Sequence, residues 1–467
     1  MFKHLIPFSI VALLATHANA SPILLATGSL SGLSQDYSGL NYNLENGQSA
    51  SLLGGFGSGL AWAGGNTFLS VPDRGPNAVS YNAAVDNTTS YLARFHTLTL
   101  GLTAATSGAL PFTLTPTLNS TTLLTSRTPL NYGTAPVPTL NTTTNAYFTG
   151  RSDAFAAGLS TNPDNARLDP EAIRVSNDGK SIYVLDEYGP YVYKFDRETG
   201  ERVDTYTLPS KFAISTLAAT KTAEIAGNTS GRVANKGMEG LAITPDGTKL
   251  VGFMQGGLIQ DGGDTSQYNR MVVIDLATKD TKEYAYNNLI DGKKYNSSEI
   301  TALNDHQFLV LERDGKGLGD GTNAVVKQVR FVDIAGAADV SNISGAANLA
   351  AKAIPTKLFL DVKSALNANG FSDANIPAKL EGLAFGEDIS LTNLVYHTLY
   401  ITNDNDFAAA SGDNQFFVFG ITDADLATFG ADIVQQQISA VPLPPSIVFM
   451  FSGLVLVGFM SRKSKNI

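Results

Sequence analysis

Four glutamates occupy similar places in four similar stretches of this sequence. Each is followed within two residues by Ile or Leu, and the four are Glu171, Glu239, Glu299 and Glu381. Carboxylates that are brought together repel one another unless a bound cation, a proton or a basic side chain relieves the repulsion. If the fold brings these stretches to one axis, we expect the four glutamates to hold a metal ion. A structural interpretation stays open, in which each carboxylate accepts backbone N–H groups of a neighbouring stretch.

A second set of acidic residues follows these stretches, where the next apolar run ends. It adds five expected metal ligands, which are Glu187, Glu312, Asp314, Asp404 and Asp406. Carboxylate and amide oxygens dominate the set, the sequence has no cysteine, and no histidines stand at a metal-binding spacing. Hard oxygen ligands of this kind favour calcium over zinc.

Two arginines stand in the same polar clusters. Arg74 and Arg313 can bind a phosphate group through forked pairs of N–H donors. We expect them to be catalytic together with Glu239 and Glu381. The expected substrate contacts are Asp73, Arg74, Tyr188, Arg313 and Asn403. Alternatively, Arg313 forms an ion pair with Glu312 or Asp314, and Arg74 stabilises its own turn. A serine esterase is less favoured because no Gly-x-Ser-x-Gly motif is present.

The elements that must position these residues are short strands. β-Branched and aromatic runs alternate with Gly, Asn, Asp and Pro clusters, which indicates an all-β fold. Asp178-Gly179 and Asp246-Gly247 each stand between two apolar runs and predict tight hairpins. Each repeated unit reads as an inner strand, a turn, a second strand, a polar loop and outer strands.

These units predict a β-propeller over residues 21–435, with long insertions. Four units are clear, and a divergent fifth starts at Gly57 with the stretch GSGLAWAGGNTFLSVPDRGP. We expect about six blades, with the sixth within residues 96–165, and the N-terminal run ILLATGSL as the strand that closes the last blade.

The two ends carry targeting patterns. Lys3, an apolar run and the triplet Ala18-Asn19-Ala20 predict a signal peptide over residues 1–20. Residues 441–467 contain the motif VPLPPS, an apolar run and a basic tail, and resemble a PEP-CTERM sorting signal that lacks the family's Glu. This resemblance implies a hydrophobic helix that anchors the protein in the membrane until an exosortase-like enzyme processes it. The expected location is the periplasm, the cell surface or the extracellular space.

Several motifs, in order, resemble one family. They are Asp-Arg-Gly from Asp73, Asp-Pro-Glu-Ala-Ile from Asp169, Glu-Tyr-Gly-Pro from Glu187, Glu-Gly-Leu-Ala from Glu239 and Glu381, Glu-Arg-Asp from Glu312, and Asn-Asp-Asn-Asp-Phe from Asn403. Over residues 50–420 the chain is similar to the phytase-like domain, also described as having esterase-like activity of phytase. The resemblance implies a β-propeller that hydrolyses a phosphate or carboxylic ester.

The predicted function is therefore that of an exported, metal-assisted ester hydrolase, acting as a phosphoesterase on a small molecule. The alternative is a non-catalytic propeller that binds a ligand at the cell surface or in an extracellular matrix. Nucleic acid is not an expected partner, because the net charge is −10 and no basic run precedes the tail.

Overall fold

The computed structural model describes residues 21–78 and 88–439. The predicted signal peptide and sorting segment lie outside these residues. Within the described part of the chain, no helix is long and apolar enough to cross a membrane.

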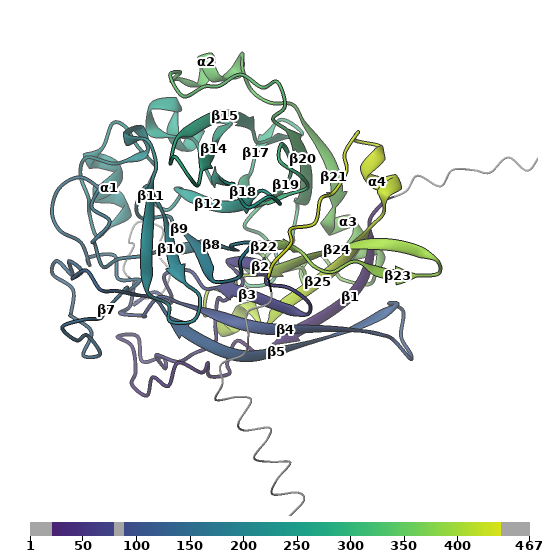
Figure 1. Ribbon diagram of the computed structural model, residues 1–467, viewed down its shortest axis with the longest axis horizontal. Helices are drawn as coiled ribbons and strands as arrows, with labels where there is room; N and C mark the ends of the chain where they lie inside the picture. The colour runs from purple at the N-terminus through teal and green to yellow at the C-terminus, as the bar shows by residue number, and fades with distance from the viewer. Residues whose placement is uncertain (1–20, 79–87, 440–467) are drawn as a thin grey trace, which may run out of the picture.

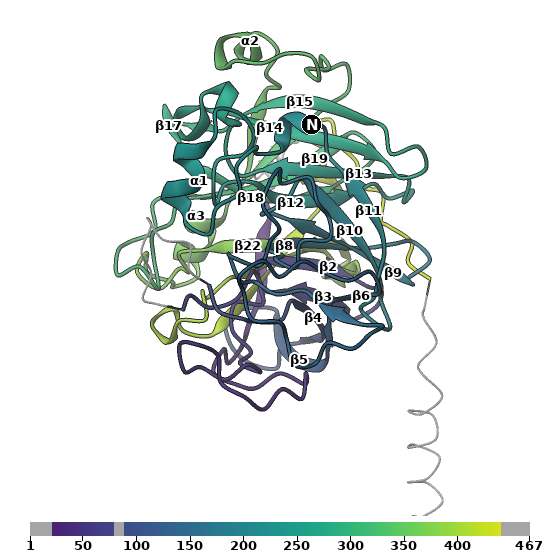
Figure 2. The same cartoon turned by 90° about the vertical axis from the view of Figure 1, so that its left-hand side faces the viewer.

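Five antiparallel sheets stand around one axis and form a β-propeller (Figures 1 and 2). The first blade consists of β2 (Gly59–Trp62), β3 (Thr67–Val71), β4 (Arg94–Ala104) and β5 (Phe112–Leu123). The second consists of β8 (Pro170–Val175), β9 (Ser181–Asp186), β10 (Tyr191–Asp196) and β11 (Arg202–Thr207). The third consists of β12 (Met238–Ile243), β13 (Lys249–Met254), β14 (Tyr268–Asp275) and β15 (Thr281–Asn287). The fourth blade consists of β18 (Asn296–Ala302), β19 (Gln307–Arg313), β20 (Lys327–Asp333) and β21 (Thr356–Asp361). The fifth consists of β22 (Leu380–Phe385), β24 (Leu394–Asn403), β25 (Asn414–Ile421) and β1 (Ile23–Leu30).

The fifth blade is completed by the N-terminal strand, as the sequence predicts. β1 pairs with β25 in antiparallel fashion, with Leu24 opposite Phe419, so the two ends of the ring are joined by hydrogen bonds. The short strand β23 (Ile389–Leu391) extends the same blade beside β24. Both predicted hairpin turns are also present, with Gly179 and Gly247 at φ of 73° and 72°.

The prediction of about six blades is wrong, because the described residues form five. Residues 96–165 supply most of β4, all of β5 and an irregular segment in which β6 (Thr125–Ser126) pairs with β7 (Ala146–Tyr147). β4 and β5 are the two outer strands of the first blade, and they are long, with 11 and 12 residues. The segment therefore lengthens an existing blade and contributes no inner strand of its own.

Apolar side chains fill the space between each pair of neighbouring blades. Because side chains alternate between the two faces of a strand, Ala172 packs toward the third blade while Ile173 packs toward the first. Five such clusters, one for each pair of adjacent blades, hold the ring together.

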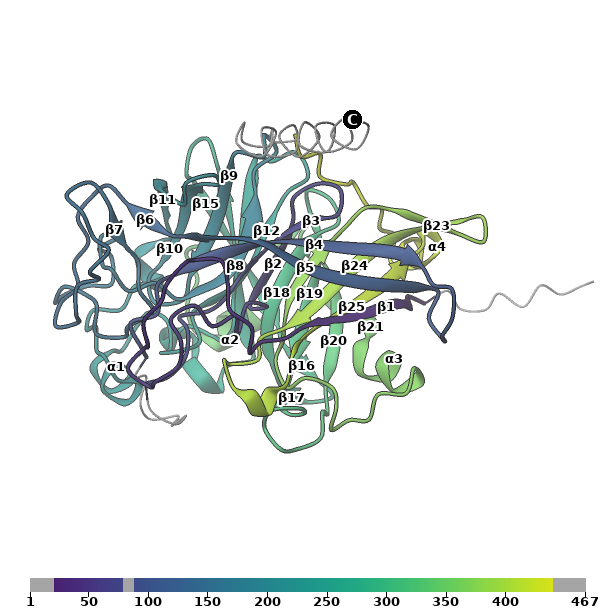
Figure 3. The same cartoon turned by 90° about the horizontal axis from the view of Figure 1, so that it is seen from below.

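The remaining elements lie mainly at the two ends of the propeller. α1 (Lys221–Gly227) and the ribbon of β16 (Leu289–Ile290) and β17 (Lys293–Lys294) lie at one end, which is at the bottom of Figure 3. The other elements are α2 (Ala346–Ala350), α3 (Val362–Ala368), α4 (Asp423–Ala427) and the single turns η1 (Ser210–Phe212), η2 (Ile259–Asp261), η3 (Gly263–Thr265) and η4 (Ala409–Ser411).

The chain after α4 covers the other end of the central channel. The Val434 amide donates to the Leu303 carbonyl, and the side chains of Gln435 and Gln436 donate to the carbonyls of Gly386 and Val175. These bonds reach the fourth, fifth and second blades.

Candidate functional site

A β-bulge at the same point of three inner strands directs a glutamate into the central channel. The pairing of β8, β12 and β22 with the next strand skips one residue, which is Glu171, Glu239 and Glu381 respectively. A bulge leaves one residue outside the ladder and redirects its side chain. The three glutamates therefore line one cavity.

The fourth predicted glutamate is displaced by one residue. In β18 the residue that the pairing skips is Ser298, so Glu299 occupies the place held by small residues, Ala172, Gly240 and Gly382, in the other strands. A shift of one residue turns a strand side chain to the opposite side. Glu299 lies outside the cavity lining, is fully buried, and accepts the Leu241 amide at 2.8 Å. It thus makes the inter-blade contact of the structural interpretation.

The cavity has a volume of about 1220 Å³ and opens at the end of the propeller where α1 lies. Of the described residues, nine acidic and five basic side chains line it, which leaves an excess of negative charge when all of these are ionised. Nine of the predicted site residues are among them: Asp73, Arg74, Glu171, Glu187, Glu239, Arg313, Glu381, Asp404 and Asp406.

Four further predicted residues lie outside the cavity lining, each with a partner. Glu312 accepts the Ser297 hydroxyl at 2.8 Å, and burial raises the pKa of Glu312 to about 7. The predicted ligand Asp314 accepts the Lys327 ammonium at 2.7 Å. The remaining two are predicted substrate contacts: the Tyr188 hydroxyl donates to the Gly150 carbonyl at 3.3 Å, and the Asn403 side chain accepts the Gln415 amide at 2.6 Å.

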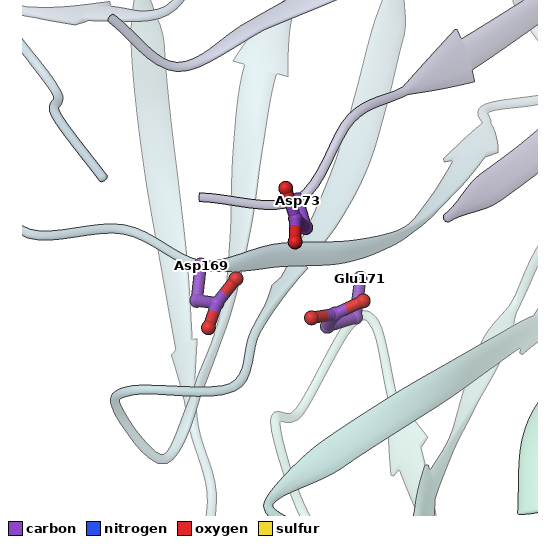
Figure 4. A group of neighbouring side chains, drawn as sticks. All are labelled: Asp73, Asp169 and Glu171. Carbon is purple, nitrogen blue, oxygen red and sulfur yellow. The ribbon is translucent and has the colours of Figure 1, made fainter. Parts of the chain in front are cut away.

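Among the residues that the structure describes, two groups of three carboxylates have the spacing of metal ligands. One group is Asp73, Asp169 and Glu171, shown in Figure 4, and the other is Asp73, Asp404 and Asp406. Within each group, one oxygen of every residue lies within 4.8 Å of the others. Oxygens so close together, in hard carboxylate ligands, fit calcium. Asp73 belongs to both groups.

Burial and mutual repulsion raise the pKa values of several cavity carboxylates. Burial raises the pKa of Asp73 to about 7 and the pKa of Glu187 to about 8. Burial and the negative charges of neighbouring acids hold the pKa values of Glu171 and Glu239 well above the ordinary value. Asp73 and Glu187 therefore take up protons near neutral pH unless a cation binds beside them, and the protonated form is likewise favoured at Glu171 and Glu239.

The two arginines in the cavity are bonded to acids from other blades. Arg74 donates to Asp169 through its backbone amide and its guanidinium, both at 2.9 Å. Arg313 donates to Glu381, and its Nη2 lies 3.9 Å from Glu239. The pairs expected with Glu312 or Asp314 are thus replaced by pairs that cross between blades.

Three residues that the sequence interpretation did not select also belong to this site. Asp169 and Lys379 stand two residues before Glu171 and Glu381, which is the same position directly before two inner strands. This shared position is the signal that identifies them. Gln255 donates to Glu239 at 2.5 Å, and it immediately follows β13.

The loop that carries Asp404 and Asp406 is held in an unusual conformation. Asp406 and Phe407 both have φ of 53°, in the left-handed region that side chains rarely adopt. Phe407 is buried against Gly54 and Gly55, where a Cβ would overlap its ring, and against the Tyr91 ring at 5.0 Å. Such strain persists only where the surrounding structure fixes it, and here it presents two carboxylates to the cavity.

The model of the phytase-like family, described as esterase-like activity of phytase, matches residues 51–407 of this chain. An uncharacterized secreted protein of Arthroderma benhamiae is 33% identical over 177 residues, which cover 32% of this chain and 34% of that protein. The chain thus spans about a third of the length of this curated relative.

Solved structures with a similar course of the chain share little sequence with it. The periplasmic gluconolactonase of Pseudomonas aeruginosa is 12% identical, with a TM-score of 0.31, over 86% of this chain and 99% of the other. The glutaminyl cyclase of Myxococcus xanthus is 9% identical, also with a TM-score of 0.31, over 86% of this chain and 100% of the other.

Proposed function

The chain belongs to the phytase-like family, and on this premise we propose that it is a metal-assisted ester hydrolase whose active site is the acidic cavity. The observation that carries the proposal is the convergence of buried carboxylates from separate blades on one cavity that also contains Arg74 and Arg313. A purely structural cluster has no need of an open cavity of this size. Among esters, we propose phosphoesters as the substrate.

The cation is proposed to lie at Asp73, Asp169 and Glu171. A bound divalent ion supplies charge neutralisation and a lowered pKa of a coordinated water molecule. Asp169 also holds Arg74 in place, because its two oxygens accept the Arg74 backbone amide and guanidinium. The same acid therefore supports both the proposed cation site and a group that binds an anion.

Glu239 is the proposed general acid. Burial and the neighbouring acids Glu187 and Glu381 hold its pKa well above the ordinary value, which favours the protonated form, and this proton can pass to the leaving oxygen when the ester bond breaks. The Gln255 amide, at 2.5 Å, fixes the direction of this carboxyl group. Glu381 is the proposed base for the attacking water, since Arg313 holds it in the cavity.

Arg313 and Arg74 are the proposed contacts to the anionic oxygens of the substrate. They come from the fourth and first blades and lie in the lining of the same cavity. A guanidinium that is already fixed by a carboxylate loses little side-chain freedom when it binds a phosphate.

The test is a substrate panel for the purified full chain. Phytate, p-nitrophenyl phosphate and short acyl p-nitrophenyl esters would each be supplied with calcium and, separately, with a chelator. Calcium-dependent release of phosphate supports the full proposal. Turnover of acyl esters alone restricts it to carboxylic esters. Absence of turnover in every condition overturns it and leaves the ligand-binding propeller.

Export is part of the proposal. The pattern in residues 1–20 and the printed name of the Arthroderma relative, a secreted protein, support it. The expected result is a chain that begins near Ser21 when it is recovered from outside the cytoplasm and sequenced from its N-terminus. An intact N-terminus in the cytoplasmic fraction would contradict export.

A further inference from the structure

The two groups of carboxylates differ in what already occupies them. Lys379 lies beside the second group, with its ammonium 3.2 Å from Asp404 and 2.5 Å from Asp406. The Lys379 carbonyl also accepts the Asp404 amide at 3.0 Å, so the backbone fixes the lysine next to this loop. The second group therefore contains a cation that belongs to the chain itself.

The first group also contains a cation of the chain, the Arg74 guanidinium, but of the three acids in this group only Asp169 is paired with it among the described residues. Arg74 bonds to Asp169, and Asp73 accepts the Gly75 amide at 2.8 Å. Glu171 is only 7% exposed, and among the described residues its carboxylate makes no hydrogen bond or ion pair. It points toward Asp73 and Asp169 (Figure 4). A carboxylate with little access to water and no partner is unfavourable in its charged form, and a bound cation removes this cost.

From this difference we propose that Lys379 acts as a built-in cation of the site, and that the cavity binds one divalent ion, at Asp73, Asp169 and Glu171, instead of two. The inference rests on the proposed function for the presence of a metal. It goes further in assigning the number of ions and the role of Lys379. The ammonium also keeps one positive charge at Asp404 and Asp406 when the metal is removed.

Removal of this ammonium opens the second group to a metal ion. In Lys379→Met, the carboxylates of Asp73, Asp404 and Asp406 keep a ligand spacing but lose their positive partner. Asp73 can then bridge two ions, because each carboxylate oxygen has more than one lone pair. Lys379→Arg keeps a cation at the same place, so the second group stays closed to metal.

The experiment counts bound calcium in the full chain by isothermal titration and by elemental analysis. We expect about one ion per chain for the wild type and for Lys379→Arg, and about two for Lys379→Met. Lys236→Met is the matched control, since Lys236 lines the same cavity but pairs with Asp264. It should bind about one ion. Two ions in the wild type, or one in Lys379→Met, would overturn the proposal.

A second pair of variants keeps the test decisive if Lys379→Met fails to fold. Asp406→Asn should leave the calcium dissociation constant of the wild type within about threefold, whereas Glu171→Gln should weaken it at least about a hundredfold. The reverse order would overturn the proposal. Counting ions needs no turnover, so an active enzyme with two ions contradicts only this inference. One bound ion without hydrolysis contradicts only the proposed function.

Discussion

Arg174 and Glu299 form an ion pair inside the ring of inner strands, with 3.1 Å between Nη2 and Oε2. The Glu299 carboxylate also accepts the Leu241 amide, and the Arg174 guanidinium donates to the carbonyls of Leu60, Ile173, Ile300 and Leu383. These bonds reach all five inner strands. Arg174 also lines a small second cavity, of about 50 Å³, beneath the chain that follows α4.

Loss of this arginine should destabilise the whole propeller. Arg174→Met leaves Glu299 buried without its cation and leaves inner-strand carbonyls without a donor, so we expect the free energy of unfolding to fall by about 3–5 kcal/mol. The control is Arg127→Met, whose side chain is 76% exposed and pairs with Glu201. There the expected loss is below about 1 kcal/mol. Denaturant unfolding measures both, and equal losses would contradict the role of Arg174.

The stability contributed by His397 should decrease as pH rises. Burial lowers the pKa of His397, but hydrogen bonds to Asp423 and Asp388, at 3.0 and 2.9 Å, outweigh burial and raise it above 6.5. When folding raises the pKa of a group, the resulting stability is fully present below the pKa of the unfolded state. It is lost as the pH rises through the pKa of the folded state. His397→Gln should therefore cost more stability at about pH 5.5 than at about pH 9. An equal cost at both pH values would contradict this assignment.

Gly150 should control the position of the Asp73–Arg74 turn. A Cβ at Gly150 would overlap the Arg74 carbonyl group. Gly150→Ala must therefore displace Arg74, and we expect kcat/KM to fall at least about tenfold. Gly101→Ala is the control, because its nearest neighbour for a new Cβ is the Thr115 carbonyl oxygen at 3.7 Å. Equal activities of the two variants, at matched folded protein, would exclude this positioning role.

Replacement of Glu239 by Gln should lower the rate without lowering stability. The amide cannot donate the proton of a carboxylic acid, so kcat should fall at least about tenfold, which is about 1.4 kcal/mol. Stability should stay unchanged or rise, because the amide cannot acquire the negative charge that burial, Glu187 and Glu381 disfavour at this position. Glu198→Gln, at an exposed turn, serves as the control. An unchanged kcat for Glu239→Gln would remove Glu239 from the mechanism.

The sequence predicted the repeated blades because each inner strand carries the same short pattern. The divergent copy at Gly57 and the closing strand at Ile23 also took the predicted places. The prediction of a sixth blade was wrong because long outer strands, such as β4 and β5, increase the sequence spacing between inner strands. Spacing alone cannot distinguish a lengthened blade from an additional one.

The site was harder to predict, because a shift of one residue decides which way a strand side chain points. Glu299 directly precedes Ile300, whereas one residue separates Glu171 from Ile173, and this small difference moves Glu299 out of the cavity. The pairing of Lys379 with Asp406 depends on how a strand and a distant loop meet. No local sequence pattern encodes that contact.

The most direct test of the central claim is the calcium dependence of hydrolysis, measured with the substrate that the panel identifies. Wild type and Glu171→Gln would be compared after chelation and again after calcium is restored. We expect chelation to lower the wild-type rate at least about a hundredfold and calcium to restore it, whereas Glu171→Gln should stay inactive in both conditions. A wild-type rate that is indifferent to the chelator would contradict the claim that the buried carboxylates act through a bound cation.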